Sequence, residues 1–351
     1  MSLPPLRLGT RSSRLARAQS QHVADALKAA TGREVELVNI ITPGDQSTEP
    51  VHRLGVGVFV SALRDALIAG EIDFAVHSYK DLPTAGPEEL YIAAVPPRED
   101  PRDALVSRGG RTLAELPPGS TVGTGALRRI AQLHALGLQL TVVPIRGNID
   151  KRLARVFGPE ADLDAVVLAR AGLSRVGQTD DITETIDPMM LLPAPAQGAL
   201  AVECRTDDRD MRQLLAVLDD RPSRLAVTAE RAFLATLEAG CSAPVAAFAV
   251  LAEGDDGEEI YLRGAVISPD GYREHRLSSS GPVAPEGRTD AATALTVAEE
   301  IGRSLATELL DAGADKILDA PVSFGAQAQE GAPLSSGAQT QDMGAQNDPH
   351  P

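Results

Sequence analysis

Val122-Gly-Thr-Gly-Ala-Leu-Arg128-Arg129 is followed, after one further strand-like run, by Ile145-Arg146-Gly-Asn-Ile-Asp-Lys151-Arg152. Each of these two segments leaves an apolar, β-like run and opens a helix-like one. Alternation of strand and helix predicts a parallel α/β sheet, in which ligands collect beyond the carboxyl ends of the strands. The stretch from residue 122 to residue 152 therefore predicts the class of fold and the sheet edge at which a site forms.

The same two segments are cationic in an acidic chain. They contain five cations and one acid, Asp150, whereas the whole chain has a formal net charge of −16. Free backbone N–H groups and the helix dipole favour anions at the start of a helix, and arginine binds carboxylate or phosphate through a planar fork. Solvated charges on a helix face are the alternative. The position of the arginines after strands favours a site for a small molecule with several negative charges.

Composition limits the other classes of function. The 351 residues suffice for two or three domains. The negative charge argues against nonspecific binding to nucleic acid or to an anionic membrane. The first residues lack the apolar core of a signal peptide, and no apolar run approaches a membrane span. Two cysteines, Cys204 and Cys241, form neither a disulfide framework nor a zinc-type cluster, so we expect a reduced, cytoplasmic protein.

The N-terminal part of the chain repeats the plan of strand and helix. Strand-like runs at 6–9, 35–41 and 72–76 alternate with helical spacing. Ser12 or Ser13 can cap the first helix, and Gly32 ends it. Residues 42–57 predict a mobile loop. Arg11 and Lys80-Asp81 follow strands, which places them at the ligand-binding edge of their sheet.

Two proline-rich crossings, at 96–101 and 192–195, bracket the cationic unit. A chain that enters a second domain and returns to the first would leave a cleft between two hinged lobes. We therefore predict α/β lobes like those of a bilobed solute-binding protein, with a small α+β domain and a disordered tail. The predicted bounds are 1–97 with 198–217 for domain 1, 101–193 for domain 2, 222–320 for domain 3 and 323–351 for the tail.

Asp81 and Cys241 are the candidates for covalent or acid–base chemistry. A carboxylate after a strand and beside Lys80 can stabilise a developing cation or exchange protons, although an aspartate that caps a turn is the alternative. Cys241 follows a helix C-terminus, where the dipole does not favour a thiolate. It is therefore either an inert thiol or a covalent tether for an electrophilic cofactor. Cys204 lies in an apolar strand-like run and should be a buried small hydrophobe.

Seven segments, in order over almost the whole chain before the tail, resemble the porphobilinogen deaminase (hydroxymethylbilane synthase) family. They are Leu8-Gly-Thr-Arg11-Ser-Ser13, Ala75-Val-His-Ser-Tyr-Lys80-Asp81-Leu-Pro, Arg98-Glu-Asp-Pro-Arg-Asp-Ala, Gly123-Thr-Gly-Ala-Leu-Arg-Arg129, Ile145-Arg-Gly-Asn, Leu192-Pro-Ala-Pro-Ala-Gln197-Gly and Glu238-Ala-Gly-Cys241. Each segment alone is a weak signal, whereas their order and spacing make the combination specific.

The resemblance implies a fold of three domains and a transferase of tetrapyrrole biosynthesis. In the family, a dipyrromethane cofactor is attached through a thioether to the loop cysteine, here Cys241. Four porphobilinogen molecules are condensed head to tail onto this primer, with loss of one ammonia per substrate, and 1-hydroxymethylbilane is released. Loss of ammonia gives a cationic azafulvene-like electrophile, and Asp81 matches the catalytic aspartate that stabilises it and assists proton transfers. No metal or nucleotide is required.

The resemblance also implies which residues bind the acetate and propionate groups of cofactor and substrate. These are Arg11, Ser13, Lys80, Arg128, Arg129, Arg146, Arg152, Arg175 and Gln197. Phe59 matches the phenylalanine of the lid. The chain departs from many relatives at Val56, where they carry a lysine that Arg53 could replace, and at Gly125-Ala126, where they carry two serines. Both departures put individual ligand contacts in question but leave the arginine set intact.

The implied partners are porphobilinogen and the growing polypyrrole chain, bound by a monomer without nucleic-acid or membrane partners. The sequence alone leaves two other interpretations open. One is a bilobed binding protein for an acidic small molecule, without catalysis. The other is a family member that has lost activity through its lid changes. The Lys80-Asp81 pair and the Cys241 loop favour the enzyme over the binding protein.

Overall fold

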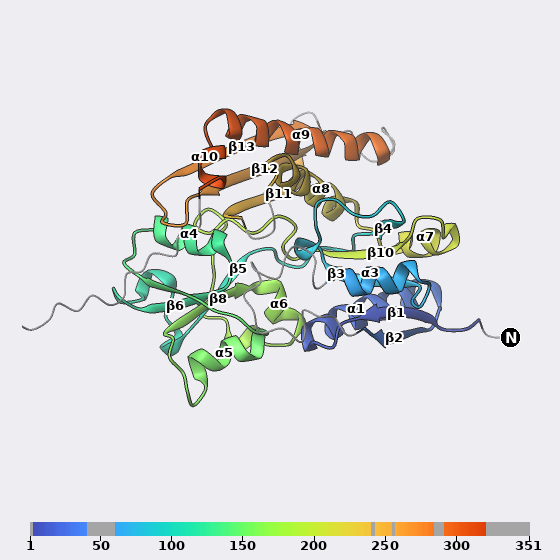
Figure 1. Cartoon of the computed structure of the whole chain (residues 1–351), viewed down its shortest axis with the longest axis horizontal. Coiled ribbons are helices and arrows are strands. Elements are labelled where there is room, and N and C mark those ends of the chain that lie inside the picture. Colours follow the sequence, from blue (N-terminus) through green and yellow to red (C-terminus); the bar gives the residue numbers. More distant parts are fainter. Residues whose placement is uncertain (1–2, 41–59, 240–242, 255–256, 284–290, 321–351) are drawn as a thin grey trace, which may run out of the picture.

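Three β-sheets organise the chain (Figure 1). The computed structural model describes residues 3–40, 60–239, 243–254, 257–283 and 291–320. Two five-stranded sheets, β2-β1-β3-β10-β4 and β7-β6-β8-β5-β9, form a first and a second lobe, and the sheet β11-β12-β13 forms a third unit. The third unit lies along both lobes, at the top of the view in Figure 1. This arrangement confirms the predicted fold class.

The first lobe is built around strand β3. Its strands are β1 (Leu6–Thr10), β2 (Val35–Asn39), β3 (Phe74–Ser78), β4 (Leu90–Ala94) and β10 (Leu200–Arg205). Strands β1, β2 and β3 are parallel, and β10 runs antiparallel between β3 and β4. Its helical elements are α1 (Arg14–Thr31), α3 (Ser61–Ile68), α7 (Arg209–Leu215) and the short 3₁₀ turns η2 (Tyr79–Asp81) and η6 (Ala216–Leu218).

The second lobe has the same plan around strand β8. Its strands are β5 (Asp103–Ser107), β6 (Thr121–Thr124), β7 (Thr141–Pro144), β8 (Ala165–Ala169) and β9 (Glu184–Thr185). Strand β6 is parallel to β7 and β8, and β5 is antiparallel to β8 and β9. Its helical elements are α4 (Leu127–Ala135), α5 (Ile149–Phe157), α6 (Arg170–Arg175), η3 (Arg108–Gly110), η4 (Leu113–Glu115) and η5 (Thr179–Asp181).

Each lobe contains one strand that runs against the expected parallel direction. Strand β5 is the first strand after the crossing out of the first lobe, and β10 is the first strand after the crossing back. Parallel neighbours require a crossover connection within one sheet, usually a helix. The chain reaches β5 and β10 from the other lobe. These two strands therefore need no crossover connection within their own sheet and can run antiparallel. The parallel strands keep their shared carboxyl edge, so the expected place of the site is unaffected.

Helix α1 shows how the local sequence sets an element. The hydroxyl oxygen of Ser13 accepts a hydrogen bond from the amide of Ala16 (3.2 Å), which identifies Ser13 as the cap. Gly32 ends the helix with a left-handed φ of 72°. Val23 and Leu27, four residues apart, are buried in the core of the first lobe. Both end signals expected from the sequence are therefore confirmed.

The third unit packs helices on an antiparallel meander. Its strands are β11 (Val245–Gly254), β12 (Gly257–Ile267) and β13 (Glu274–Pro282), and its helices are α8 (Arg221–Thr236), α9 (Ala291–Asp311) and α10 (Asp315–Leu318). Phe233 of α8 and Leu305 of α9 are fully buried in its core. Among the described helices, none is long and apolar enough to cross a membrane.

Glu230 of α8 ties the third unit to both crossings. Its side chain is fully buried and forms a bidentate pair with Arg98 of the first crossing, at 2.7 and 3.0 Å. The same carboxylate accepts from the amides of Ala196 in the second crossing (2.6 Å) and Ala249 in β11 (2.7 Å). A buried carboxylate is tolerated when its oxygens are filled in this way. Glu230 therefore joins three segments that are distant in sequence.

Candidate active site

Strand β3 delivers Lys80 and Asp81 to the edge of the first sheet. It ends at Ser78, and the turn η2 follows at once. The amide of Tyr79 donates to the carbonyl of Ala199 (3.1 Å), which anchors the turn at the start of β10. Asp81 is exposed, whereas Lys80 is half-buried. The turn therefore offers an accessible carboxylate beside an ammonium group that is partly withdrawn from water.

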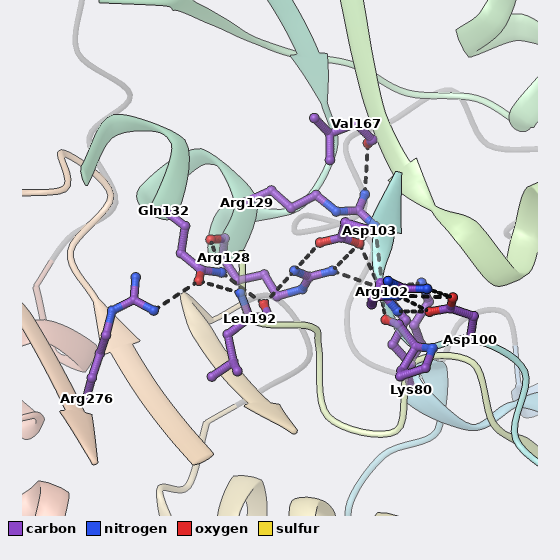
Figure 2. Close-up of polar contacts among 12 residues, drawn as sticks. Lys80, Asp100, Arg102, Asp103, Arg128, Arg129, Gln132, Val167, Leu192 and Arg276 are labelled. Carbon is purple, nitrogen blue, oxygen red and sulfur yellow. Dashed lines mark hydrogen bonds and ion pairs between the residues drawn. The ribbon is translucent and has the colours of Figure 1, made fainter. Parts of the chain in front are cut away.

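Strand β6 delivers Arg128 and Arg129 in the same way, in the first turn of α4. Each residue is only 4% exposed, and both guanidinium groups meet the buried carboxylate of Asp103 at the start of β5 (Figure 2). Arg128 Nη1 and Nη2 lie 2.7 and 3.0 Å from Asp103 Oδ2 and Oδ1, and Arg129 Nη2 lies 2.8 Å from Oδ1. The two arginines are therefore held rigidly rather than projecting into solvent.

The cluster around Asp103 contains more positive than negative charge. Burial alone would raise the pKa of Asp103, but the charges of Arg128 and Arg129 outweigh it and hold the pKa far below its ordinary value. Burial lowers the pKa of Arg128, and Asp103 opposes that shift. The charge of Lys80 also acts in this group. Asp103 and Asp81 supply two negative charges against the three positive charges of Arg128, Arg129 and Lys80, so a further carboxylate from a ligand would be stabilised here.

Gln197 joins the two lobes at this cluster. Its Oε1 accepts from Lys80 Nζ (3.2 Å) and from Arg128 Nη2 (2.9 Å). Its Nε2 donates to Asp103 Oδ1 (2.7 Å) and to the carbonyl of Pro101 (2.7 Å). The side chain is fully buried. Lys80 of the first lobe and Arg128 of the second thus meet through a single amide group.

Arg152 lies in α5 of the second lobe, within electrostatic range of Arg129. Its Nε donates to the carbonyl of Gly147 (2.8 Å). Burial lowers the pKa of Arg152 to about 10, with a further lowering by Arg129 and Arg146 and an opposing effect of Asp81. These neighbours place Arg152 within electrostatic reach of both Arg129 and Asp81, and Arg146 is exposed nearby. At neutral pH Arg152 keeps its charge.

The segment with Arg11 and Ser13 lies where the first lobe touches the second. Ser13 uses its oxygen as the helix cap described above, and Arg11 is half-buried. Arg14, which follows Ser13, pairs with Asp150 (2.9 Å) and donates to the carbonyl of Val176 (2.6 Å). Both of these partners lie in the second lobe. Asp150, the single acid of the two cationic segments, therefore forms an ion pair with an arginine of the first lobe.

Arg175, in α6, lies beside the second crossing. Its Nη2 donates to the carbonyl of Gly198 (2.6 Å), and burial lowers its pKa to about 10. Gly198 has a φ of +87°, and a Cβ there would lie 2.3 Å from the carbonyl oxygen of Glu99. Only glycine meets both conditions. Arg175 is thus attached to a backbone position that joins the two crossings.

The glycines before the arginine pair are required by packing. From the sequence alone, Gly123 and Gly125 predict a close approach of the backbone to a ligand, which the structure leaves as a prediction. A Cβ on Gly123 would lie 2.5 Å from a side-chain atom of Leu163, and one on Gly125 would lie 2.8 Å from the carbonyl oxygen of Ile145. Both glycines are therefore required by packing within the second lobe, which is sufficient to explain them.

Several predicted features fall outside the described residues. These are Cys241, Phe59 with the predicted mobile loop, the departures at Arg53 and Val56, and the C-terminal tail. Cys204, on β10, is fully buried, and burial raises the pKa of its thiol to about 11. The prediction that Cys204 is a packed hydrophobe is confirmed.

The donor set of this edge suits a ligand with several carboxylates. The structure brings together Lys80, Asp81, Arg128, Arg129 and Arg152. Within the described part of the chain, the buried Nε atoms of Arg128 and Arg129 and the hydroxyl oxygen of Thr124 have no hydrogen-bond partner. Buried polar atoms are normally satisfied, so these atoms point to a polar group that the site binds. Acetate and propionate side chains supply such acceptors.

Sequence reasoning missed three residues that shape this site. Asp103 pairs with Arg128 and Arg129. Glu230 bonds the amide of Ala196 beside Gln197, and Arg231 bonds carbonyls on both sides of Asp81. Asp103 lies inside a segment that carried the family resemblance, but a buried aspartate cannot be told from a surface aspartate by its neighbours in sequence. Glu230 and Arg231 lie in a helix whose apolar face was the only visible signal.

Lys80 is expected to titrate near pH 8 in protein that carries no cofactor. Burial lowers its pKa to about 8, Asp81 opposes the shift, and Arg129 and Arg128 add to it. The charge is complete at lower pH and is lost as pH rises through about 8. A bound carboxylate should raise the pKa, because it favours the charged form.

The chain has only four lysines, so carbon-13 NMR of labelled lysine can follow this titration. The Cys241→Ser protein, in which no covalent cofactor is expected, is the sample, and Lys80→Arg assigns the signal. Lys28, which is exposed and pairs with Glu34 at 3.0 Å, is the internal comparison. A Lys80 midpoint near the ordinary value of about 10.4 would contradict the prediction.

Family models match nearly the whole described chain. Residues 6–213 match the porphobilinogen deaminase, dipyromethane cofactor binding domain, and residues 224–311 match the porphobilinogen deaminase, C-terminal domain. Among solved structures, the methionine binding protein MetQ is similar at 15% identity and a TM-score of 0.38, covering 61% of this chain and 89% of that one. That likeness is too slight to support a conclusion.

Curated relatives agree with the family models over almost their full length. Porphobilinogen deaminase of Nocardia farcinica is 57% identical over 335 residues, which cover 93% of this chain and 92% of the relative. Porphobilinogen deaminase of Mycobacterium tuberculosis strain H37Rv is 54% identical over 318 residues, which cover 89% and 98% respectively. This chain, with its two lobes, their cationic edge and the third unit along them, is therefore a member of the porphobilinogen deaminase family.

Proposed function

We propose that the edge where Asp81 meets Lys80, Arg128, Arg129 and Arg152 is the active site of a hydroxymethylbilane-forming transferase. The reaction condenses four porphobilinogen molecules head to tail on a dipyrromethane primer and releases ammonia and 1-hydroxymethylbilane. The observation that carries the assignment to this edge is the meeting of one accessible carboxylate with an excess of buried and half-buried cations from both lobes. A substrate with several carboxylates needs the cations for binding. Because it becomes cationic at one carbon during the reaction, it also needs the carboxylate.

The cations bind the carboxylate side chains of the pyrroles. Arg128 and Arg129 are held by Asp103 with their Nε atoms unpaired within the described chain, so each keeps an N–H donor that a ligand carboxylate can fill. Lys80 and Arg152 lie within electrostatic range of the pair, and Arg11, Ser13, Arg146, Arg175 and Gln197 complete the proposed set. Preorganised donors of this kind lose little entropy on binding.

Asp81 acts on the reacting carbon and nitrogen atoms of the substrate. As ammonia leaves, positive charge develops on the pyrrole, and a nearby carboxylate stabilises it. The same carboxylate can accept a hydrogen bond from a pyrrole N–H and pass on the proton that the attacked ring loses. Its exposed position on η2 leaves it free to do so.

The proposed dipyrromethane group is attached through a thioether to Cys241, and Phe59 belongs to the lid. When bound, the group supplies the free pyrrole carbon at which the chain is lengthened. Helix α8 ends at Thr236, before Cys241 in the sequence. The proposal keeps the domain bounds given above and a cytoplasmic monomer that acts on porphobilinogen and the growing polypyrrole chain.

Intact-mass measurement of the purified protein tests this function. The wild type should exceed its sequence mass by two linked pyrrole units, and Cys241→Ser should lack the excess and fail to turn over porphobilinogen. Cys204→Ala is the matched control, because Cys204 is buried in the first lobe, and it should keep the excess. A wild type that stays unmodified after incubation with porphobilinogen would favour a binding protein for acidic molecules.

A further inference from the structure

Arg231 of α8 holds the turn that carries Asp81, although it belongs to the third unit. Its Nη1 donates to the carbonyls of Tyr79 (3.3 Å) and Leu82 (3.1 Å), and its Nη2 donates to the carbonyl of Pro83 (2.6 Å). The guanidinium carbon also lies 4.4 Å from the centroid of the Tyr79 ring. One side chain therefore grips the backbone on both sides of Asp81.

These bonds matter because the turn is short. Within η2, the amide of Leu82 donates to the carbonyl of Tyr79 at 3.2 Å, and 3₁₀ turns of this kind have poor hydrogen-bond geometry. Pro83 follows, and a proline has no N–H to extend the hydrogen bonding. Arg231 supplies donors to the carbonyls on this side of Asp81. The orientation of Asp81 relative to β3 therefore depends on a residue of another unit.

The part of α8 that carries Arg231 is itself held firmly in place. The preceding residue, Glu230, is fully buried and bonds both crossings and β11, as described above. Tyr79 packs against a buried cluster that contains Val227 of α8 together with Val95, Ala196 and Ala199. Two neighbouring residues of α8, Glu230 and Arg231, thus bind the segments that connect the lobes and the turn that carries Asp81 to the same helix.

We infer that Arg231 is a positioning residue for Asp81. It fixes the backbone of the turn so that the carboxylate meets the reacting pyrrole, and it does not itself contact the substrate. The inference rests on the proposed function, because it assigns a purpose to the geometry of Asp81. Misplacement of a catalytic group by about 1 Å can lower a rate by about 10²-fold. Loss of Arg231 should therefore affect the chemical step more than substrate binding.

Arg231→Ala is the variant that tests this, and Arg224→Ala is its matched control. Arg224 lies on the same helix, is also half-buried, and bonds Asp219 (2.7 Å) and the carbonyl of Ile92 (3.3 Å), away from the turn. In Arg231→Ala we expect kcat to fall by about 10- to 100-fold with KM within about twofold of the wild type. Arg224→Ala should keep kcat. Added guanidinium ion should restore part of the lost kcat, whereas methylammonium, which lacks the planar fork, should not.

A second readout needs no turnover. In the Cys241→Ser background, hydrogen exchange of the peptide covering residues 74–90 should be about tenfold faster or more when Arg231 is replaced by Ala. The same peptide should be unchanged by Arg224→Ala. Faster exchange confined to this peptide shows release of the turn rather than general unfolding.

The outcomes separate this inference from the proposed function. Unchanged kcat or unchanged exchange in Arg231→Ala overturns the positioning role, and so does an equal loss of kcat in Arg224→Ala. A raised KM without a fall in kcat would overturn it in favour of substrate contact. If the wild type releases no ammonia from porphobilinogen, the proposed function fails instead, and the exchange result alone decides whether Arg231 holds the turn.

Discussion

Asp81→Ala is expected to lower kcat by at least about 10³-fold while the protein keeps its fold and its affinity for carboxylates. Removal of one group that stabilises transition-state charge typically costs 10²- to 10³-fold, and loss of its part in proton transfer adds to that. Asp81 is exposed, so its replacement leaves no buried cavity or unpaired buried partner. Single-turnover release of ammonia from porphobilinogen measures the chemical step directly.

Asp65→Ala is the control for this variant. Asp65 is an exposed aspartate on α3 of the same lobe, and its replacement should leave kcat within about twofold of the wild type. Asp81→Asn keeps the shape without the charge and should be nearly as slow as Asp81→Ala. Wild-type ammonia release by Asp81→Asn would remove the charge of Asp81 from the mechanism.

Asp103→Asn is expected to have the largest effect on stability. The carboxylate is fully buried and pairs with both Arg128 and Arg129. Breaking a buried pair by removing one partner typically costs about 3–5 kcal/mol, because the remaining charge stays buried without compensation. The new amide also turns an N–H donor toward groups that can only donate. We expect the free energy of unfolding in urea to fall by that amount.

Glu299→Gln provides the matched comparison for Asp103→Asn. It makes the same kind of change in an exposed pair, since Glu299 and Arg303 are about half exposed on α9, and pairs of this type contribute about 0.3–0.5 kcal/mol. A loss of less than about 1 kcal/mol in Asp103→Asn would show that the arginine pair finds other partners. Since the two arginines are released, the loss of stability should come with weaker carboxylate binding.

The lobes were predictable because each strand is an apolar run that leads into a helix with recognisable end signals. The cap at Ser13 and the end at Gly32 were confirmed, and the cationic segments were correctly placed at the starts of α4 and α5. The direction of β5 and β10 was not predictable from periodicity. Direction depends on which lobe the chain comes from, and that information lies in the crossings rather than in the strands.

The ion-pair partners of the charged site residues could also not be predicted from the sequence. Arg128 and Arg129 were expected at a ligand site, and they lie at the predicted edge. The carboxylate that fixes them starts β5, which is separated from β6 in the sheet by β8. Pairings over such separations depend on the folded path of the chain. The glycines at 123 and 125 illustrate the same limit, because the atoms that require them come from Leu163 and Ile145.

The adjacency of Glu230 and Arg231 constrains how this helix can vary in length. Successive residues of an α-helix project about 100° apart, so the two side chains leave α8 in different directions, one to the crossings and one to the Asp81 turn. Inserting or deleting a single residue upstream in α8 would rotate both away from their partners at once. Length differences between relatives should therefore fall outside the helix, in the connections at its two ends.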